Sequence, residues 1–490
     1  MEKLTKNPAN HPGYGNPASL YDRISNSFLL KMGVIFILTV IMLIPMNLIN
    51  DLIDERKDRE QDVLQEISSK WGSAQVISSP VLAIPFTYIR EYYDENIKNR
   101  ELVEDWLFVL PDFSEENVTV KPEYLKRGIY KSVVYNSEID SKGVFTLKDL
   151  KSLGSAIKAV NWEKAKIIFG IKDVKGLSYL PKLKFENREY GMNKNGKLFT
   201  LFPNNLVADI QLSYEQSKSF SYHFKYELKG AKSFNYLPLA NQSKLYIKGS
   251  WGNPSFNGGF LPDKREILET SFTATWNIPS FTRKLPQQWT GQTTIYNYTD
   301  VSLSDNNIDN VSKAHNQGES SSNLISTDAD MIQVNFLPSV NNYQKTSRVA
   351  KYGLLIIILT FVSLFFTEII KYKRIHIIQY ILIGFAMIMF YSLLLALSEH
   401  VGFNVAYIIS ALLTVLLISS FVYRITKNRS IAWVFAGILG LFYLFIYALL
   451  QLRDYSLIVG TIGIFVILAV LMQISTKINW YQFENKNETR

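Results

Sequence analysis

The sequence contains no cysteine among its 490 residues. This absence excludes disulfide bonds, cysteine-ligated zinc, iron–sulfur clusters, a thiol nucleophile and an acylated cysteine anchor. Histidine is scarce, since there are five, and none has a neighbour at the spacing of a metal-binding pair. The sequence also lacks the Gly-x-Ser-x-Gly and His-Glu-x-x-His motifs of common hydrolases. We therefore expect no catalytic site, no metal and no cofactor.

The distribution of charge and of apolar residues bounds the class of protein. A net charge of +9 is compatible with nucleic-acid binding, but much of the excess lies at the ends of apolar segments, where membrane topology accounts for it. Apolar residues fill most of the last third of the chain, whereas the middle alternates short apolar and polar runs. The composition therefore averages a membrane part and a globular part. We expect the lipid bilayer, and no nucleic acid, as a partner.

Six segments have the length and composition of transmembrane helices, which need about 20 apolar residues to cross a hydrocarbon core. The first, 32–52, begins with the uncharged run MGVIFILTVIMLIPMNLI. No small-residue cleavage site follows it, so an uncleaved anchor is favoured over a signal peptide. Short connections join the other segments, which should therefore be antiparallel neighbours. These segments are 352–370, 375–397, 406–423, 431–450 and 457–474.

Lysine and arginine predict the orientation of these segments, because they are enriched in short cytoplasmic loops. The two short loops on the opposite side, 398–405 and 451–456, contain Arg453 as their only lysine or arginine. We therefore place the tails 1–31 and 475–490 in the cytoplasm, and residues 53–351 in the periplasm as part of a multi-pass inner membrane protein. The basic residues assigned to the cytoplasmic side are Lys3, Lys6, Arg23, Lys31, Lys371, Lys373, Arg374, Arg424, Lys427, Arg429, Lys477, Lys486 and Arg490.

The regions on both sides of the first span have helical spacing. Apolar residues at four-residue intervals up to Phe28 predict a short amphipathic helix in the cytoplasmic tail. After the span, Val63, Ile67 and Trp71 form one apolar stripe, and Gly72 is a plausible helix stop. We expect this second helix to dock onto the outer domain.

Beyond Gly72 the apolar period changes to two, which is typical of half-buried strands. The fold class that follows is an α+β membrane protein with one N-terminal transmembrane helix, a large, mostly β, sandwich-like periplasmic domain and five C-terminal transmembrane helices. Residues 302–330 are rich in Asn, Ser and Asp and predict a flexible polar loop. The predicted strands are 129–135, 166–171, 222–228, 245–248, 272–276 and 294–301.

Two patterns in this domain look like ligand sites but have simpler interpretations. Residues 191–197 match most of a phosphate-binding loop, but Leu198 stands where the Mg²⁺ site needs Ser or Thr. The pair Asn195-Gly196 is also a strong hairpin-turn signal. His223 lies on the polar face of a predicted strand, which favours an exposed side chain over a metal ligand.

Charged residues near the ends of the membrane segments are the candidate functional residues: Glu368, Glu399, His400, Arg453 and Asp454. Charge inside a membrane is a functional hypothesis by default. The simpler interpretation is interface anchoring, or a local ion pair between Arg453 and Asp454. No predicted span carries a charge at mid-depth and no inverted repeat is present, which counts against a transporter.

Spaced motifs over nearly the whole chain are similar to those of one family. The matching positions include Arg127, Trp251, Pro254, Phe256, Gly259 and Pro262 in the outer domain, and Tyr343, Arg348, Lys351, Tyr352, Glu368, His376, Tyr380, Gly384, Glu399, His400 and Tyr407 at the return to the membrane. On these residues the chain resembles the CreD family, inner-membrane proteins associated with cell-envelope integrity. One position departs from the family pattern, because Arg453 replaces the first residue of an acidic pair.

The resemblance implies one anchor, an outer β domain, a membrane bundle and a role in envelope homeostasis linked to a two-component stress system. It supplies no reaction, no catalytic residue and no oligomeric state. We therefore expect a non-enzymatic protein whose periplasmic domain binds envelope proteins, cell-wall components or a sensor kinase. The alternative is a membrane-surface enzyme, or a lipid-handling or transport factor, that uses Glu399, His400 and Asp454 at the outer bilayer face.

Overall fold

The computed structural model describes residues 28–94, 97–147, 157–194, 199–212, 219–295, 330–336, 342–371, 375–452 and 455–476. The chain divides into two compact units. The helical unit comprises Met1–Arg59 and Val340–Arg490, and the β unit comprises Glu60–Ser339. The predicted amphipathic helix before residue 28, positions 302–329 of the predicted polar loop and positions 477–490 of the C-terminal tail lie outside the described residues.

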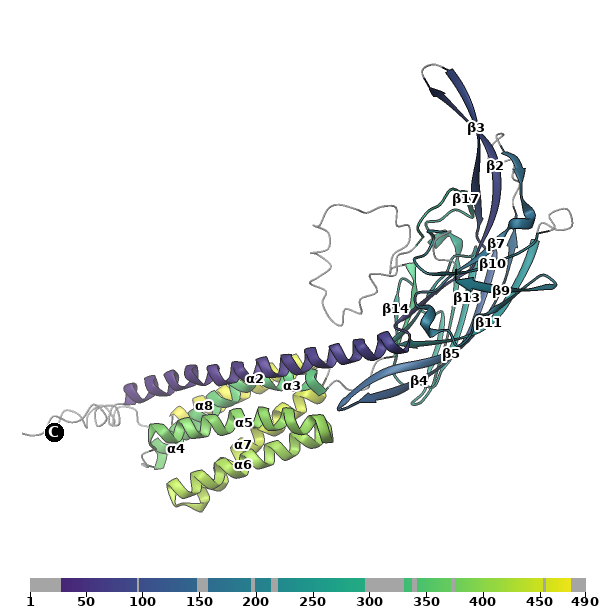
Figure 1. Ribbon diagram of the computed structural model, residues 1–490. Helices are drawn as coiled ribbons and strands as arrows, with labels where there is room; N and C mark the ends of the chain where they lie inside the picture. The colour runs from purple at the N-terminus through teal and green to yellow at the C-terminus, as the bar shows by residue number, and fades with distance from the viewer. Residues whose placement is uncertain are drawn as a thin grey trace, which may run out of the picture. The chain divides into compact units, whose positions relative to one another are not determined.

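Apolar helices form the helical unit (Figure 1). Five helical segments of the described chain are long and apolar enough to cross a membrane: Lys31–Trp71, Ile377–Val401, Phe403–Thr426, Arg429–Gln451 and Ile458–Thr476. The predicted span 352–370 falls on α4, which forms a sixth candidate only together with α3, at a bend of 41°. The helices are α2 (Phe28–Trp71), α3 (Asn342–Lys351), α4 (Gly353–Lys371), α5 (Ile377–Val401), α6 (Phe403–Thr426), α7 (Arg429–Gln451) and α8 (Ser456–Thr476).

Local sequence explains where these helices begin and end. His376 forms a capping box at the start of α5, since its ring accepts from Ile378 N and its backbone N–H donates to Gln379 Oε1. Asn428 caps α7 through its side-chain oxygen, which accepts from Ser430 N. Gly402 separates α5 from α6 with φ of 80°, a value that favours glycine.

Close contacts at two glycines pack α2 against the other helices of the helical unit. A Cβ atom at Gly384 in α5 would lie 2.8 Å from the sulfur of Met42. A Cβ atom at Gly353 in α4 would lie 2.5 Å from the terminal methyl of Met46. Small residues let helices approach closely in lipid, where van der Waals packing drives their association.

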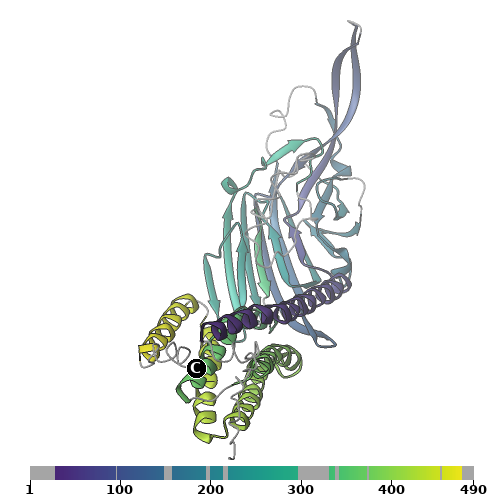
Figure 2. The ribbon, with the colours of Figure 1, turned by 90° about the vertical axis from the view of Figure 1, so that its left-hand side faces the viewer.

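The β unit contains one large and one small sheet. The small sheet has the order β1 (Gln75–Ser78), β12 (Ser233–Leu237), β18 (Ile332–Phe336) and β14 (Pro254–Gly258). Figure 2 shows strands of the large sheet side by side. The large sheet has 14 strands in the order β15 (Lys264–Ile267), β16 (Phe272–Pro279), β13 (Gln242–Gly249), β4 (Phe113–Arg127), β5 (Tyr130–Thr146), β11 (Ser219–Ala231), β8 (Lys182–Phe185), β9 (Arg188–Lys194), β10 (Asn205–Asp209), β7 (Lys166–Gly170), β2 (Val81–Asp94), β3 (Ile97–Val109) and β17 (Gln288–Thr290), with β6 (Ile157–Val160) paired to β2.

Both sheets contribute side chains to one apolar core. Phe234 and Val334 enter it from the small sheet, and Ile139, Phe224 and Trp276 enter it from the large sheet. Alternate residues of β11 and β16 are buried, as expected for strands with one face on a core. Two sheets around a shared core match the architecture of packed β layers.

Cross-strand pairs between a glycine and an aromatic residue recur in the large sheet. Gly143 lies opposite Tyr222 and Gly230 lies opposite Tyr135 between β5 and β11. In each pair the aromatic ring occupies the space that a Cβ on the glycine would need. Tyr135 is fully buried, and its hydroxyl donates to Ser233 O at 2.9 Å. These glycines therefore permit large buried rings to lie flat against the neighbouring strand.

The β unit agrees with most of the strands and helix features predicted from the sequence. The β-rich domain is confirmed, and predicted strands 222–228, 245–248 and 272–276 lie within β11, β13 and β16. The predicted strand 294–301 differs, because Thr294 and Ile295 lie in no strand and the rest falls outside the described residues. The stripe of Val63, Ile67 and Trp71 packs on Val134 and Ala231 as predicted.

The predicted stop at Gly72 is also confirmed, since α2 ends at Trp71. Gly72 has φ of 145°, in the region that favours glycine. A Cβ atom there would lie 2.6 Å from Lys229 O, so the backbone of β11 passes too close for any side chain. Both effects require glycine at this position.

Substitution Gly230→Ala tests the glycine–aromatic pairs. The new methyl group would lie 2.3 Å from the Tyr135 ring, which is held by its own hydrogen bond. We expect a loss of about 1–3 kcal/mol in the free energy of unfolding, as for other overpacked cores. The measurement is the thermal unfolding of the purified full chain, followed by tryptophan fluorescence. Gly191→Ala in β9 is the control, because nothing lies within 4 Å of its Cβ position, and equal stability of the two variants would contradict the argument.

Candidate functional site

The carboxylate of Glu368, a residue predicted from sequence, lies within a polar cluster of the helical unit. Glu368 is in the last turn of α4 and is 9% exposed. It forms an ion pair with Lys31 of α2. Tyr380 of α5 donates its hydroxyl to Glu368 Oε2 at 3.1 Å, and the backbone N–H of Ile375 donates to Oε1 at 3.2 Å. Three helices therefore meet at this one carboxylate.

The geometry of this cluster favours a structural role for Glu368. Both oxygens of the carboxylate accept hydrogen bonds, and a cation compensates its charge. Removing two charges from water is costly, and only good pairing with further hydrogen bonds offsets that cost. The cluster therefore holds α2 to α4 and α5 at one specific position along the helix.

A second polar contact involves Glu399 near the end of α5. Tyr343 of α3 donates its hydroxyl to Glu399 Oε1 at 3.0 Å, and Arg56 of α2 lies 3.8 Å from the same atom. His400 is exposed. Arg453 and Asp454 lie outside the described residues, so their approach to Glu399 stays a prediction. Glu399 is thus tied to two other helices of its own unit.

The sequence predicted the two carboxylates Glu368 and Glu399 as candidate functional residues, but it did not predict their partners. Lys31 was predicted only as a cytoplasmic charge, and Arg56 was not among the candidate functional residues. Tyr343 and Tyr380 were among the positions similar to the CreD family, which was the available signal for both tyrosines. Their role as donors became visible only when distant helices were placed side by side.

The family-motif positions of the β unit mostly stabilise its edges and core. Arg127 at the end of β4 forms an ion pair with Glu66 of α2 at 2.5 Å. The ring of Trp251 packs on Tyr124 with centroids 5.2 Å apart. Phe256 in β14 meets Trp276 edge to face at 5.7 Å.

The remaining motif positions lie at turns and breaks. Pro254 begins β14, Gly259 donates its backbone N–H to Met331 O at 2.9 Å, and Pro262 lies in the segment between β14 and β15. In the helical unit, Lys351 ends α3, and Tyr352 occupies the bend between α3 and α4. None of these positions converges on a single site within the described ranges.

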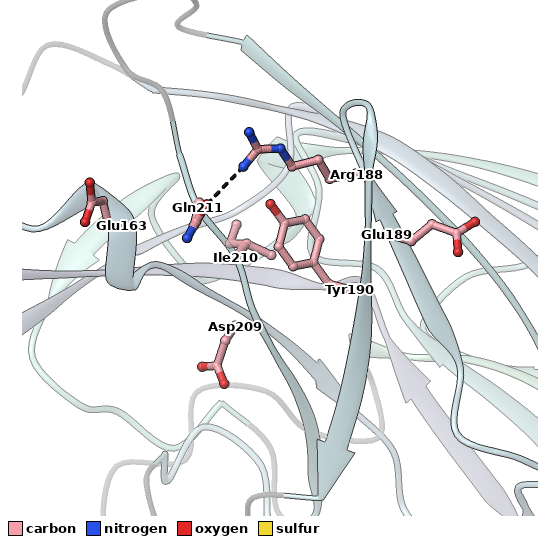
Figure 3. Close-up of a pocket in the computed structure, with 7 residues that line it drawn as sticks. All are labelled: Glu163, Arg188, Glu189, Tyr190, Asp209, Ile210 and Gln211. Carbon is pink, nitrogen blue, oxygen red and sulfur yellow. Dashed lines mark hydrogen bonds between the residues drawn. The ribbon is translucent and has the colours of Figure 1, made fainter.

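An open hollow in the β unit was not predicted from sequence (Figure 3). Its volume is about 480 Å³. It lies where β9 begins and β10 ends, beside the short 3₁₀ helix η2 (Trp162–Lys164). We call it the β9–β10 groove, and its lining consists of Glu163, Arg188, Glu189, Tyr190, Asp209, Ile210 and Gln211.

The β9–β10 groove combines apolar and charged groups. Figure 3 shows the Tyr190 ring beside Ile210, with Arg188 reaching Gln211 above them. Arg188 Nη1 donates to Gln211 Oε1 at 2.9 Å, and Asp209 forms an ion pair with Lys166. An aromatic ring flanked by a guanidinium and carboxylates is suited to binding a polar ligand of mixed charge. In the described part of the chain, no group of three or more His, Asp or Glu side chains is placed to hold a metal ion.

Substitution Glu368→Gln tests the role of the polar cluster. It would leave Lys31, whose side chain is 13% exposed, without a counter-charge. We expect a loss of about 3 kcal/mol, as when one partner of a buried pair is removed. The measurement is the unfolding midpoint of the full chain in detergent.

Two variants provide controls for this prediction. Glu399→Gln should cost less than about 1 kcal/mol, because Arg56 is 36% exposed and the pair is longer. Adding Lys31→Met to Glu368→Gln should recover part of the lost stability, since it removes the unpaired cation. A Glu368→Gln protein as stable as Glu399→Gln would contradict the assignment.

Similarity to solved structures gives no argument about function. A variant of an M1 zinc metallopeptidase from Deinococcus radiodurans aligns with 36% of this chain and 41% of its own at 7% identity, with a TM-score of 0.20. The unsubstituted enzyme aligns with the same shares at 7% identity and a TM-score of 0.19. The chain thus spans less than half of these proteins, and scores this low do not identify a common fold.

Comparison of sequences identifies the family. The family described as "Inner membrane protein CreD" matches residues 27–481. The protein of that name from Escherichia coli (strain K12) is 28% identical over 464 residues, which cover 92% of this chain and 94% of that protein. The match includes the described parts of both units, and it confirms the resemblance noted in the sequence. The chain therefore belongs to the CreD family of inner membrane proteins.

Proposed function

We propose that this protein is a non-enzymatic inner membrane protein that maintains the integrity of the cell envelope. Its β unit binds an envelope component outside the membrane, and its helical unit anchors it. The observation that carries the proposal is a large β unit with an open, mixed-charge groove, inserted between membrane-type helices. A link to an envelope stress response follows from the family resemblance and is part of the proposal.

The proposal includes a topology of six spans with both termini in the cytoplasm. The spans are α2, the bent pair of α3 and α4, and helices α5 to α8. Lys and Arg cluster in the loops assigned to the cytoplasm, which supports this orientation. Residues 60–339 then lie in the periplasm, where they can meet the cell wall and envelope proteins.

The β9–β10 groove supports binding of a ligand with both apolar and charged parts. Tyr190 offers an aromatic face, and Arg188 and Glu163 offer opposite charges at its margin. Cell-wall fragments that combine sugar rings with charged peptides have this chemistry. An open groove suits part of a large polymer better than it suits a small enclosed substrate.

Single cysteines test the proposed topology, because the natural chain has no thiol. We expect Glu266→Cys on the exposed strand β15 to react with a membrane-impermeant maleimide in spheroplasts. Arg429→Cys at the start of α7 should react only after lysis. The measurement is the mass shift of the labelled protein on a gel. Labelling of Arg429→Cys but not Glu266→Cys in unbroken spheroplasts would reverse the orientation.

Substitution Tyr190→Ala tests the groove as a binding site. We expect affinity of the full chain in nanodiscs for soluble cell-wall fragments to fall by about tenfold or more, the usual size of an aromatic hot spot. The variant should also fail to complement a deletion strain under cell-wall stress. Tyr179→Ala is the control, because Tyr179 is 51% exposed and does not line the groove. Equal affinity of both variants for the cell-wall fragments would show that the groove is not the binding site.

A further inference from the structure

A glutamate occupies an inward position of β4, within the apolar core of the β unit. Glu116 is 1% exposed. Its neighbours on the same face of β4 are Ser114 and Val118, and its cross-strand neighbours are Ser141 in β5 and Leu245 in β13. An isolated carboxylate in such surroundings tends to bind a proton, because burying its charge is very costly.

The hydrogen bonds of Glu116 satisfy only half of its carboxyl group. Ser114 Oγ donates to Glu116 Oε1 at 3.0 Å, and Ser141 Oγ donates to the same atom at 2.9 Å. Glu116 Oε2 has no hydrogen-bond partner among the described residues. Within the same ranges no lysine, arginine or histidine forms an ion pair with it. These surroundings therefore suit a neutral carboxylic acid better than an ionised carboxylate.

Tyrosines from β11 of the same sheet and from β12 of the small sheet lie near this acid. Tyr222 in β11 donates to Ser114 Oγ at 3.0 Å, and Tyr236 in β12 lies 3.5 Å from the same oxygen. The hydroxyl of Tyr226 in β11 is buried and has no partner in the described chain. Strand β13 pairs with β4, and its residues on the same side as Glu116 are neutral, among them Leu245. No element packed on Glu116 thus supplies a positive charge from the described residues.

The pKa values follow from this burial. Burial raises the pKa of Glu116 from 4.5 to about 8, although the bonds from Ser141 and Ser114 oppose the rise. The negative charges of Asp140 and Glu115 raise it further. Burial also raises the pKa of Tyr222, Tyr226 and Tyr236 above their ordinary value of 10.0. Glu116 is therefore the first of these four groups to lose its proton as pH rises.

Proton binding links this group to the stability of the β unit. Below pH 4.5 the folded and unfolded chains both carry the proton. Between 4.5 and about 8 only the folded chain carries it, so the unfolding equilibrium shifts toward the unfolded chain by about tenfold per pH unit. Above pH 8 the folded chain also loses the proton, and a negative charge then lies in the core with one oxygen unpaired.

We propose that Glu116 is a proton-binding site that makes packing of the two sheets of the β unit depend on pH. When protonated, the acid lets β4, β5 and β11 close against the small sheet. When ionised, it favours local opening that admits water to its unpaired oxygen. Under the topology proposed above, the group responds to the pH outside the inner membrane, and this last point alone rests on that topology.

Infrared titration of the full chain in nanodiscs tests the proposal. The carbonyl stretch of a buried protonated acid should disappear with a midpoint of about 8, and Glu116→Gln should lack this band. Glu115→Gln should retain it, because Glu115 pairs with Lys142 at 3.0 Å on the other face of β4. The protection factors of the amides in β4 and β5, which correct for the faster intrinsic exchange at higher pH, should fall as the pH rises toward the midpoint and level off above it in the natural protein. They should not depend on pH in this way in Glu116→Gln.

Ser141→Ala provides an independent measurement if Glu116→Gln fails to fold. It removes a hydrogen bond that favours the ionised form, so the midpoint should rise. A midpoint below about 6, or one unchanged in Ser141→Ala, would overturn the proposal. Loss of the band without a fall in the protection factors of β4 and β5 would also overturn it. A midpoint that falls with added sodium would show a cation site in place of a proton site. A cytosolic β unit would change only the compartment that is sensed.

Discussion

The pairing of Lys31 with Glu368 is the interaction on which the helical unit depends. A carboxylate between apolar helices is tolerated only if a cation and hydrogen-bond donors surround it. Lys31 supplies the cation, and Tyr380 and the backbone of Ile375 supply donors from α5 and the segment before it. Because an ion pair has one good geometry, it sets the position of α2 along α4 more strictly than contacts of Met42 and Met46 with glycines could.

Three glutamates lie in surroundings of low polarity, and each is stabilised there in a different way. The charge of Glu368 is compensated by the partly buried cation Lys31, and Glu399 is held by a phenol and a half-exposed arginine. Glu116 has only hydroxyl donors, so its charge is compensated by a proton. The first two arrangements hold helices together. The third places a titratable group where the two sheets of the β unit share a core, which is why we assign a switch to it.

Sequence patterns predicted the local features of this fold well. Each predicted span overlaps one helix, and β11 and β16 follow the alternation seen in residues 222–228 and 272–276. The pattern did not predict β4, because Glu116 and Ser114 are polar residues at inward positions. It also did not predict the sheet order, in which β4 lies between β5 and the parallel strand β13. Period-two alternation identifies the buried face of a strand but not its neighbours.

The sequence by itself determined which segments are apolar enough to cross a membrane, where α2 stops and which family the chain resembles, because transfer free energy and glycine geometry are properties of local residues. Only the tertiary structure decided which side chains pair with one another. Lys31 and Glu368 are 337 positions apart, and Tyr222 lies 108 positions from Ser114. Pairing at such separation depends on how all intervening elements pack, and so does the environment that sets the proton affinity of Glu116.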